Sequence, residues 1–271
     1  MKNAYEFILT EKRDQVGYLV LNRPNKLNAL HTAFVVDILD ALKDLNSDDD
    51  LRVIVIKANG RSFSVGGDLS PEAAKEFAFI ETAVEYKKVG KMWADAGREI
   101  RDLPKPTIAQ VHGHCLAGAT DLFFNCDFLI AAEDAQFGCP DVKGMESPFA
   151  HMWTYLVGPQ WAKFFLLTGD NIDGATAERI GLVMKALPAD ELEHEVDRLA
   201  RRIALIPVDF LGPNKTLVNN VLDNMGFSAS QQAAMDTSAF THLAPGVREF
   251  HQISSDKGFK AALAWRRENF G

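Results

Sequence analysis

The sequence predicts an α/β protein with a helical region in its C-terminal part. Short segments rich in Val and Ile recur just before turn residues, which is typical of buried strands. Longer segments with apolar residues three and four positions apart lie between them and indicate amphipathic helices. After Gly158 the strand pattern fades and only the helical pattern continues.

Four strands and two helices are expected in the first half of the chain. The strand-like segments are residues 17–21, 52–57, 107–111 and 127–132. Apolar residues at helical spacing cover residues 29–45 and 71–101, so a helix is expected after the first strand and another after the second. This alternation favours strands paired in one sheet with helices packed against it.

The C-terminal part is expected to be helical. Residues 175–181, 190–205, 208–225 and 257–270 have the pattern of amphipathic helices separated by Pro and Gly. No low-complexity linker interrupts them, so these helices should pack on the α/β core or on a neighbouring subunit. We therefore predict a core that carries the functional site over residues 1–205 and a helical oligomerisation region over residues 206–271.

Composition and charge exclude several classes of protein. The chain has 271 residues, of which 47% are hydrophobic and 24% charged, as in a globular protein with a large core. No run of about 18 apolar residues offers a membrane span, and charges interrupt the apolar stretches of the first residues, unlike a signal peptide. The formal net charge of −8 argues against a nucleic acid or a membrane as the partner. A cytoplasmic protein is expected.

The three cysteines do not have the spacing of a metal site or of a disulfide framework. Cys115, Cys126 and Cys139 are odd in number and lie among apolar or glycine-rich neighbours. They are expected to be buried free thiols, and no metal site is predicted.

Two glycine-containing turns follow strands and are candidates for ligand contact. In the first, residues 63–68, Gly66 and Gly67 lack Cβ atoms, so a ligand can approach the backbone closely. In the second, residues 113–121, Gly118 is expected to open a short helix, where its N–H is among the donors left unpaired. Two such donors aimed at one carbonyl oxygen form an oxyanion hole.

Two other interpretations of these turns compete with an oxyanion hole. Gly113 and Gly118 have the spacing of a phosphate-binding P-loop, but Ala119 occupies the position of the lysine that this motif requires. A nucleotide triphosphatase is therefore excluded. The glycines also suit ordinary tight turns, and their spacing alone does not decide the matter.

A larger set of segments resembles the crotonase (enoyl-CoA hydratase/isomerase) superfamily over nearly the whole chain. The resemblance implies a spiral of ββα units followed by helices that build a homotrimer or a dimer of trimers. It also implies an acyl-coenzyme A thioester as substrate, with neither a metal nor a redox cofactor. The segments are LNRPNKLNAL (21–30), FSVGGD (63–68), KPTIAQVHG (105–113), LAGATD (116–121), CD (126–127) and AQFGCPD (135–141).

The resemblance implies roles for individual positions. Gly67 and Gly118 match the positions whose N–H groups hold the thioester oxygen, and Asp121 and Asp141 match the two positions where hydratases carry catalytic glutamates. The positions expected to bind the substrate are Lys26, Asn28 and Ala29 at the nucleotide end of coenzyme A, Gly66, Asp68 and Leu69 beside the oxyanion hole, and Lys257, Arg266 and Arg267 at the phosphates. A solvated basic face on the last helix is an equal alternative for those last three.

The sequence departs from the usual hydratase at two places. Aspartate at both catalytic positions sets each carboxylate back by about 1.5 Å, and a misplacement on the order of 1 Å can cost about 10²-fold in rate. After Asp141, residues 143–153 replace a glycine-rich stretch. Within it, His151 and Trp153 are candidates for the acyl pocket, and His151 is also a candidate base. Burial in a helix core is an equally good interpretation of Trp153, and a structural role is the more common one for a single histidine near the start of a helix.

Three functions follow from these observations. Hydration of a 2-enoyl-CoA, with Asp121 and Asp141 sharing the acid–base steps, is the leading hypothesis. The alternative within the superfamily is double-bond isomerisation or hydrolytic cleavage of a β-keto acyl-CoA. The third is a non-catalytic acyl-CoA-binding protein, against which the two retained carboxylates argue.

Overall fold

The larger of two sheets forms the base of the molecule. A computed structural model describes residues 5–70, 73, 82–149 and 152–271, and within them this sheet has six strands in the order β1-β2-β3-β4-β6-β9. Strand β1 is antiparallel to β2, and the other neighbouring strands are parallel. The strands are β1 (Ile8–Arg13), β2 (Val16–Leu21), β3 (Val53–Ala58), β4 (Thr107–Val111), β6 (Phe128–Ala132) and β9 (Lys185–Leu187).

A second, smaller sheet is built from short strands. It consists of β5 (His114–Leu116), β7 (Gln136–Gly138) and β8 (Asn171–Asp173), with β5 parallel and β8 antiparallel to β7. Strand β5 directly follows β4, and β7 directly follows β6. These two turns of the chain thus contribute one strand to each sheet, as in the predicted spiral. Helix α4 (Gly118–Phe123) begins where β5 ends.

Helices cover the main sheet because each has one apolar face. Helix α1 (Thr32–Asn46) packs on β1, β2 and β3, and α7 (Ala189–Ala204) packs on the strands from β2 to β6. Helix α7 buries Leu192, Val196 and Ala200, which are four residues apart and therefore share one face. Helix α3 (Ala83–Asp102) starts at a capping box formed by Thr82 and Glu85.

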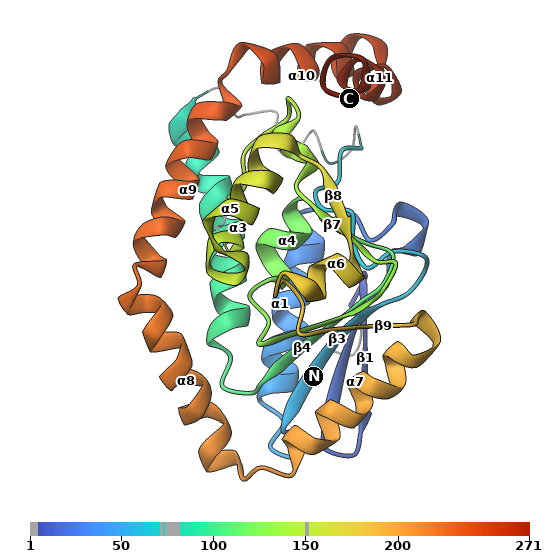
Figure 1. Cartoon of the computed structure of the whole chain (residues 1–271), viewed down its shortest axis with the longest axis vertical. Coiled ribbons are helices and arrows are strands. Elements are labelled where there is room, and N and C mark those ends of the chain that lie inside the picture. The colour runs from blue at the N-terminus through green and yellow to red at the C-terminus, as the bar shows by residue number, and fades with distance from the viewer. Residues whose placement is uncertain (1–4, 71–72, 74–81, 150–151) are drawn as a thin grey trace.

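The C-terminal helices surround the core on one side and at one end (Figure 1). Helices α8 and α9 run along one side, with α9 beside α3, while α10 and α11 lie at the end remote from the main sheet. Phe227 and Ala239 of α9 belong to the main hydrophobic core. The remaining helices are α5 (Trp153–Thr168), α6 (Gly174–Arg179), α8 (Val208–Asn224), α9 (Phe227–His242), α10 (Pro245–Lys257) and α11 (Phe259–Phe270), with 3-10 turns η1 (Pro24–Lys26) and η2 (Pro140–Val142).

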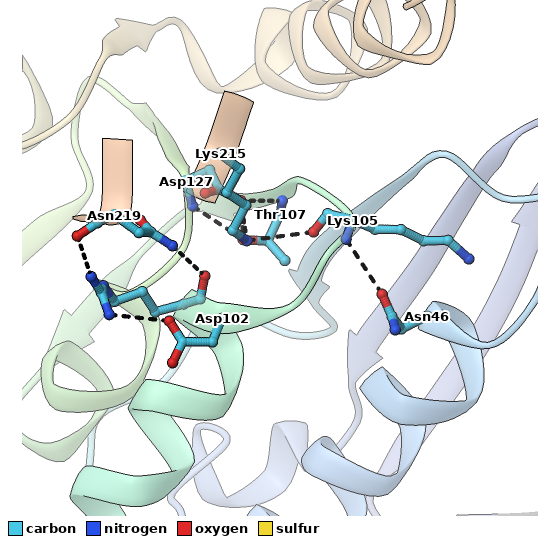
Figure 2. A network of polar contacts seen from close by, with 8 residues as sticks. Asn46, Asp102, Lys105, Thr107, Asp127, Lys215 and Asn219 are labelled. Atoms are coloured by element: carbon cyan, nitrogen blue, oxygen red, sulfur yellow. Dashed lines mark hydrogen bonds and ion pairs between the residues drawn. The ribbon is translucent and has the colours of Figure 1, made fainter. Parts of the chain in front are cut away.

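Helix α8 is fastened to the core by the polar network that Figure 2 shows. The Nζ of Lys215 lies 2.7 Å from the Oδ2 of Asp127, which also accepts hydrogen bonds from the N–H and hydroxyl of Thr107 at 2.7 and 3.0 Å. Nearby, Arg101 donates to the backbone oxygen of Asn219 at 2.7 Å. These contacts join the two predicted regions, and a division at residue 205 stays a prediction.

The observed elements agree with the four predicted strands and extend the prediction elsewhere. Helix α1 begins at Thr32, three residues later than expected. The second predicted helix is described only from Ala83 on, because residues 71–72 and 74–81 lie outside the described part. The expectation that only helices follow Gly158 was wrong, since β8 and β9 occur there. None of the described helices has the length and apolar composition to cross a bilayer.

Candidate active site

The first glycine turn presents the Gly67 N–H toward open space. Gly67 forms an isolated parallel bridge with Leu30, in which the Leu30 N–H donates to Gly66 O at 2.8 Å and the Asp68 N–H donates to Leu30 O at 2.7 Å. In such a pairing the N–H of the central residue, Gly67, faces away from Leu30. No described residue accepts a backbone hydrogen bond from it.

The second glycine turn has an unusual backbone at its central residue. Ala117 adopts φ 55° and ψ −133°, a region that costs a non-glycine residue about 1–3 kcal/mol. Its N–H donates to Gly138 O at 3.0 Å, and its carbonyl accepts from the Thr120 N–H at 2.8 Å. These bonds hold the turn from which Gly118 starts α4, so the Gly118 N–H has no partner within the helix.

The structure brings the two predicted donors together. A β-carbon built on Gly118 would lie 3.6 Å from the backbone nitrogen of Gly67, and one built on Gly67 would have no atom within 4 Å. Both glycines are partly exposed. Two neighbouring N–H groups beside open space have the arrangement needed to bind one carbonyl oxygen.

A cavity of about 310 Å³ is lined by Gly67 and, from the second glycine turn, by Leu116; Gly118 itself is not part of its lining. Its walls come from the loop after β2, from both glycine turns, from η2 and from α11, so segments distant in the sequence meet there. Helix α11 of the same chain therefore covers the site. The predicted residues that line the cavity are Lys26, Ala29, Gly67, Asp68, Leu69, Asp141 and Arg266.

Of the two predicted catalytic carboxylates, Asp141 is the one that lines this cavity. Residues 140–142 form η2, which follows directly from β7 and carries the side chain to the cavity wall. No described residue donates a hydrogen bond to its carboxylate. Burial, reinforced by the charge of Glu146, raises the pKa of Asp141 to about 8 against the opposing charge of Arg266. Burial and the charge of Glu146 both favour the protonated form of this carboxyl.

Asp121 is placed differently from Asp141. It lies in the first turn of α4, is 5% exposed and does not line the cavity. Its Oδ2 accepts a hydrogen bond from the Phe149 N–H at 3.0 Å. Its carboxylate therefore fixes the loop between η2 and α5 to α4.

Aromatic side chains close the space beyond the oxyanion donors. The ring of Trp93 on α3 comes within 3.5 Å of the β-carbon position of Gly118. Phe149 stacks on Trp93 with ring centroids 6.3 Å apart and lies 5.5 Å from the ring of Tyr86. All three side chains are less than 9% exposed, so an acyl group held at Gly118 would meet an apolar wall.

Comparison with known proteins identifies the family. The model of the enoyl-CoA hydratase/isomerase family matches residues 11–252, which include both glycine turns and the cavity residues apart from those of α11. The chain belongs to the enoyl-CoA hydratase/isomerase family. The predicted crotonase-type fold is confirmed, and so is the predicted membership of this superfamily.

Individual proteins of the family are similar to this chain over most of its length. A crotonyl-CoA hydratase of Syntrophomonas wolfei is 37% identical over 206 residues, covering 74% of this chain and 76% of its own. The crystal structure of an enoyl-CoA hydratase/isomerase from Xanthobacter autotrophicus Py2 is similar with a TM-score of 0.93 and 30% identity, covering 99% and 100% of the two chains. The crystal structure of an enoyl-CoA hydratase from Mycobacterium smegmatis has a TM-score of 0.90 and 28% sequence identity, and the match covers 98% of this chain and 96% of that one.

Three of the predicted binding residues are engaged in contacts within the protein: Asn28 and Gly66 lie behind the cavity wall, and Asp68 lines the cavity but is paired with an arginine. Asn28 is fully buried: its amide donates to Asn59 O and Ser62 O, both at 2.9 Å, so it holds the loop and does not reach a ligand. Asp68 pairs with Arg23 at 2.7 Å. Although burial opposes it, the Ser70 N–H and then Arg23 lower the pKa of Asp68. Gly66, at φ +89°, packs directly behind Gly118.

The other predicted binding residues lie away from the cavity. Trp153 is 1% exposed, and its ring packs in the core 4.8 Å from Phe124 and 4.2 Å from Phe165, centroid to centroid. Lys257 and Arg267 are exposed and do not line the cavity, in contrast to Arg266. His151 lies outside the described residues.

Sequence reasoning left two residues of the site unassigned, Glu146 and Tyr86. Glu146 follows Asp141 by five positions, but closeness in the sequence does not show where its side chain lies. Tyr86 donates a hydrogen bond from its hydroxyl to Glu146 Oε2, a contact between α3 and a loop that no local pattern reveals. Burial raises the pKa of Glu146 to about 6 despite the lowering effect of this hydrogen bond.

Within the part of the chain that the structure describes, no group of three or more His, Cys, Asp or Glu side chains is placed to hold a metal ion. All three cysteines are buried and free, as predicted.

Proposed function

We propose that this protein is an enoyl-CoA hydratase that adds water to a 2-enoyl thioester without a cofactor. The observation that carries the proposal is that Gly67 and Asp141 line one cavity, while Gly118 lies directly beside Gly67, and that no described residue donates a hydrogen bond to the Asp141 carboxyl. The relatives named as hydratases support it. The predicted cytoplasmic location stays a prediction.

The geometry supports a reaction through an enolate. The Gly67 and Gly118 N–H groups bind the thioester oxygen, which draws electrons from the conjugated double bond and favours attack of water at C3. The oxygen of water bonds to C3, the C2–C3 π bond breaks, and its electron pair forms the enolate. The protonated Asp141 delivers its proton to C2, and the carboxylate that remains takes up the proton that the attacking water loses. Asp121 is proposed to position the Phe149 loop against the acyl group.

The carrier part of the substrate is proposed to occupy the outer half of the cavity. Lys26 is exposed at the mouth, and Ala29 lies behind it on the same loop. Arg266 reaches the cavity from α11, where burial lowers its pKa although the charge of Asp141 opposes this. Both cations suit the phosphates of coenzyme A, and Lys257 and Arg267 are left to the exposed surface.

Hydration is tested with purified protein and 2-enoyl-CoA substrates of several chain lengths, including crotonyl-CoA. We expect loss of the absorbance of the conjugated thioester and formation of a 3-hydroxyacyl-CoA. Asp141→Asn should lower kcat/KM by about 10²–10⁴, whereas Asp134→Asn, an exposed aspartate in the loop before β7, should leave it unchanged. Full activity of Asp141→Asn would rule out the proposed acid.

Double-bond isomerisation is the second candidate function, because it needs one proton-shuttling carboxyl, and Asp141 alone of the two predicted carboxylates faces the cavity. It is distinguished by offering 3-enoyl-CoA and following the appearance of the conjugated thioester. If Asp141→Asn abolishes both hydration and isomerisation, both reactions use Asp141. Binding of enoyl-CoA without any turnover, and without exchange of the C2 proton in heavy water, would instead select the non-catalytic alternative.

The helical region is proposed to assemble the protein into a homotrimer or a dimer of trimers. Phe210, Leu217, Val218 and Val221 of α8 are each more than half exposed and recur at helical spacing. Light scattering on the purified protein tests the assembly. Leu217→Asp combined with Val221→Asp should dissociate it, and a monomeric wild type would contradict the proposal.

A further inference from the structure

We propose that Glu146, anchored by Tyr86, is the charge partner of Asp141, and that the two carboxyls together hold one proton, which Asp141 delivers to the acyl chain. Glu146 is thus a positioning residue that acts through Asp141. The inference deepens the proposed hydratase function and rests on it for the step at C2.

The loop after η2 returns to Asp141 at the position of Glu146. The backbone N–H groups of Met145 and Glu146 both donate to the Asp141 carbonyl oxygen at 2.9 Å. These two bonds close a tight turn, so residues 141 and 146 are held together by the main chain. Met145 lines the same cavity as Asp141.

Tyr86 fixes the carboxylate of Glu146 from another element. Its hydroxyl donates to Glu146 Oε2, and its side chain is held in α3 with only 3% exposure. The Tyr86 ring stacks on His242, with ring centroids 3.9 Å apart, and it also packs against the ring of Phe149. A hydrogen bond from a donor held this firmly favours the ionised form of Glu146.

Asp141 receives no comparable support. Its carboxylate accepts no hydrogen bond from the described residues, and the Nη1 of Arg266 donates to the Sδ of Met145 at 3.1 Å. Two carboxyls in a poorly hydrated place do not both ionise, because the second charge is repelled by the first. The better-supported Glu146 keeps the charge and Asp141 keeps the proton. The order of their raised pKa values, Asp141 above Glu146, agrees.

The remaining ionisable groups around the pair leave this assignment in place. Burial raises the pKa of the Tyr86 hydroxyl and of the Cys139 thiol well above their ordinary values, so both stay neutral. Arg266 is the cation that acts on Asp141 from α11. The other charged groups at the cavity or beside the loop are Lys26, Asp68 paired with Arg23, Asp121 bonded to the Phe149 N–H, and Lys143 paired with Asp170.

The shared proton makes the hydration step balance. Asp141 gives its proton to C2 as hydroxide from water bonds to C3. The proton that this water loses is taken up by the pair, which then again holds one proton and one negative charge. Neither carboxyl needs to exchange a proton with bulk solvent during a turnover.

The test is the titration of Asp141 in the free enzyme and in Glu146→Gln. The protein is labelled with ¹³C at the aspartate carboxyls, and Asp141 is assigned by its loss in Asp141→Asn. We expect the midpoint of the Asp141 titration to move to lower pH by about 1–2 pH units in Glu146→Gln. The alkaline limb of the pH–rate profile for hydration should move to lower pH with it. Glu146→Asp, which keeps the charge, should restore part of the shift.

Tyr86→Phe gives an independent variant for the case that Glu146→Gln does not fold. Loss of the hydroxyl removes the support of the Glu146 charge, so the Asp141 titration should again move to lower pH. Glu133→Gln, an exposed glutamate that meets neither carboxyl, should leave it where it is in the wild type.

The outcomes separate this inference from the proposed function. An Asp141 titration that stays unchanged in both Glu146→Gln and Tyr86→Phe overturns the inference, whatever the activity. A wild type that hydrates no enoyl-CoA overturns the proposed function, and the ¹³C titration still decides whether the pair exists.

Discussion

A β-carbon on Gly66 would lie 2.9 Å from the backbone nitrogen of Gly118, closer than such atoms approach in proteins. Gly66 also has φ +89°. Gly66→Ala is therefore expected to push the two oxyanion donors apart and to strain the turn. We expect kcat/KM to fall by about 10²–10³ and the free energy of unfolding to fall by about 1–3 kcal/mol.

Gly67→Ala is the matched comparison, because a β-carbon there has no neighbour within 4 Å. This variant should unfold at the wild-type denaturant concentration, while its methyl group enters the cavity and weakens acyl-CoA binding. Equal unfolding of Gly66→Ala and the wild type would show that the two turns are not packed as described.

The raised pKa of Asp141 predicts a pH dependence of stability. A carboxyl whose pKa is raised by folding binds more protons in the folded than in the unfolded state, so stability falls as pH rises from about 4 to about 8. Asp141→Asn removes this loss. We expect the variant to exceed the wild type in free energy of unfolding by at least about 1 kcal/mol at about pH 9 and to match it near pH 4.

Urea unfolding at a series of pH values measures this difference. Asp134→Asn, which removes an exposed carboxylate, serves as the control and should follow the wild type at every pH. If Asp141→Asn is less stable than the wild type at high pH, Asp141 is ionised and well supported in the folded protein.

Trp93 is expected to limit the length of the acyl group. Its ring lies 3.5 Å from the β-carbon position of Gly118, where the acyl chain would leave the oxyanion hole. Trp93→Ala should raise kcat/KM for long enoyl-CoA substrates relative to crotonyl-CoA by about tenfold, since each buried CH₂ contributes about 0.8 kcal/mol. Trp161→Ala, on α5 outside the cavity, should not change the ratio.

The ion pair between Lys215 and Asp127 is expected to hold α8 on the core. The Lys215 side chain is 7% exposed, and its removal leaves a buried charge on Asp127. Lys215→Met should lower the free energy of unfolding by about 3 kcal/mol. Lys91→Met, which breaks the exposed pair of Lys91 with Asp95, should cost about 0.5 kcal/mol or less. Similar losses in both variants would contradict the role of the network.

The sequence was informative where a local pattern determines the structure. Strand 128–132 is a continuous apolar run and strand 107–111 is rich in β-branched residues, and both were expected nearly to the residue. Gly118 was expected at the start of a helix, and α4 begins there. By contrast, β1 buries little besides Ile8, and β8 and β9 have three residues each, so none of the three has a period to detect.

The site was predictable in its backbone and less so in its side chains. The glycine turns have distinctive sequences, and the resemblance assigned both donors. The placement of a carboxylate depends on which segment packs over it: Asp141 faces the cavity, whereas Asp121 bonds to the Phe149 N–H. The contact of Tyr86 with Glu146 joins residues 60 positions apart, so no local pattern predicts it. For Trp153, the local sequence pattern is the same whether the side chain is buried in the core or lines a pocket.

The proposed oxyanion donors at Gly67 and Gly118 are main-chain N–H groups. A mutation that changes a nearby side chain therefore does not remove them. The carboxylates around them are exposed to ordinary mutational drift. A lineage can therefore exchange its acids and bases one at a time while the enolate-forming part of the machinery persists.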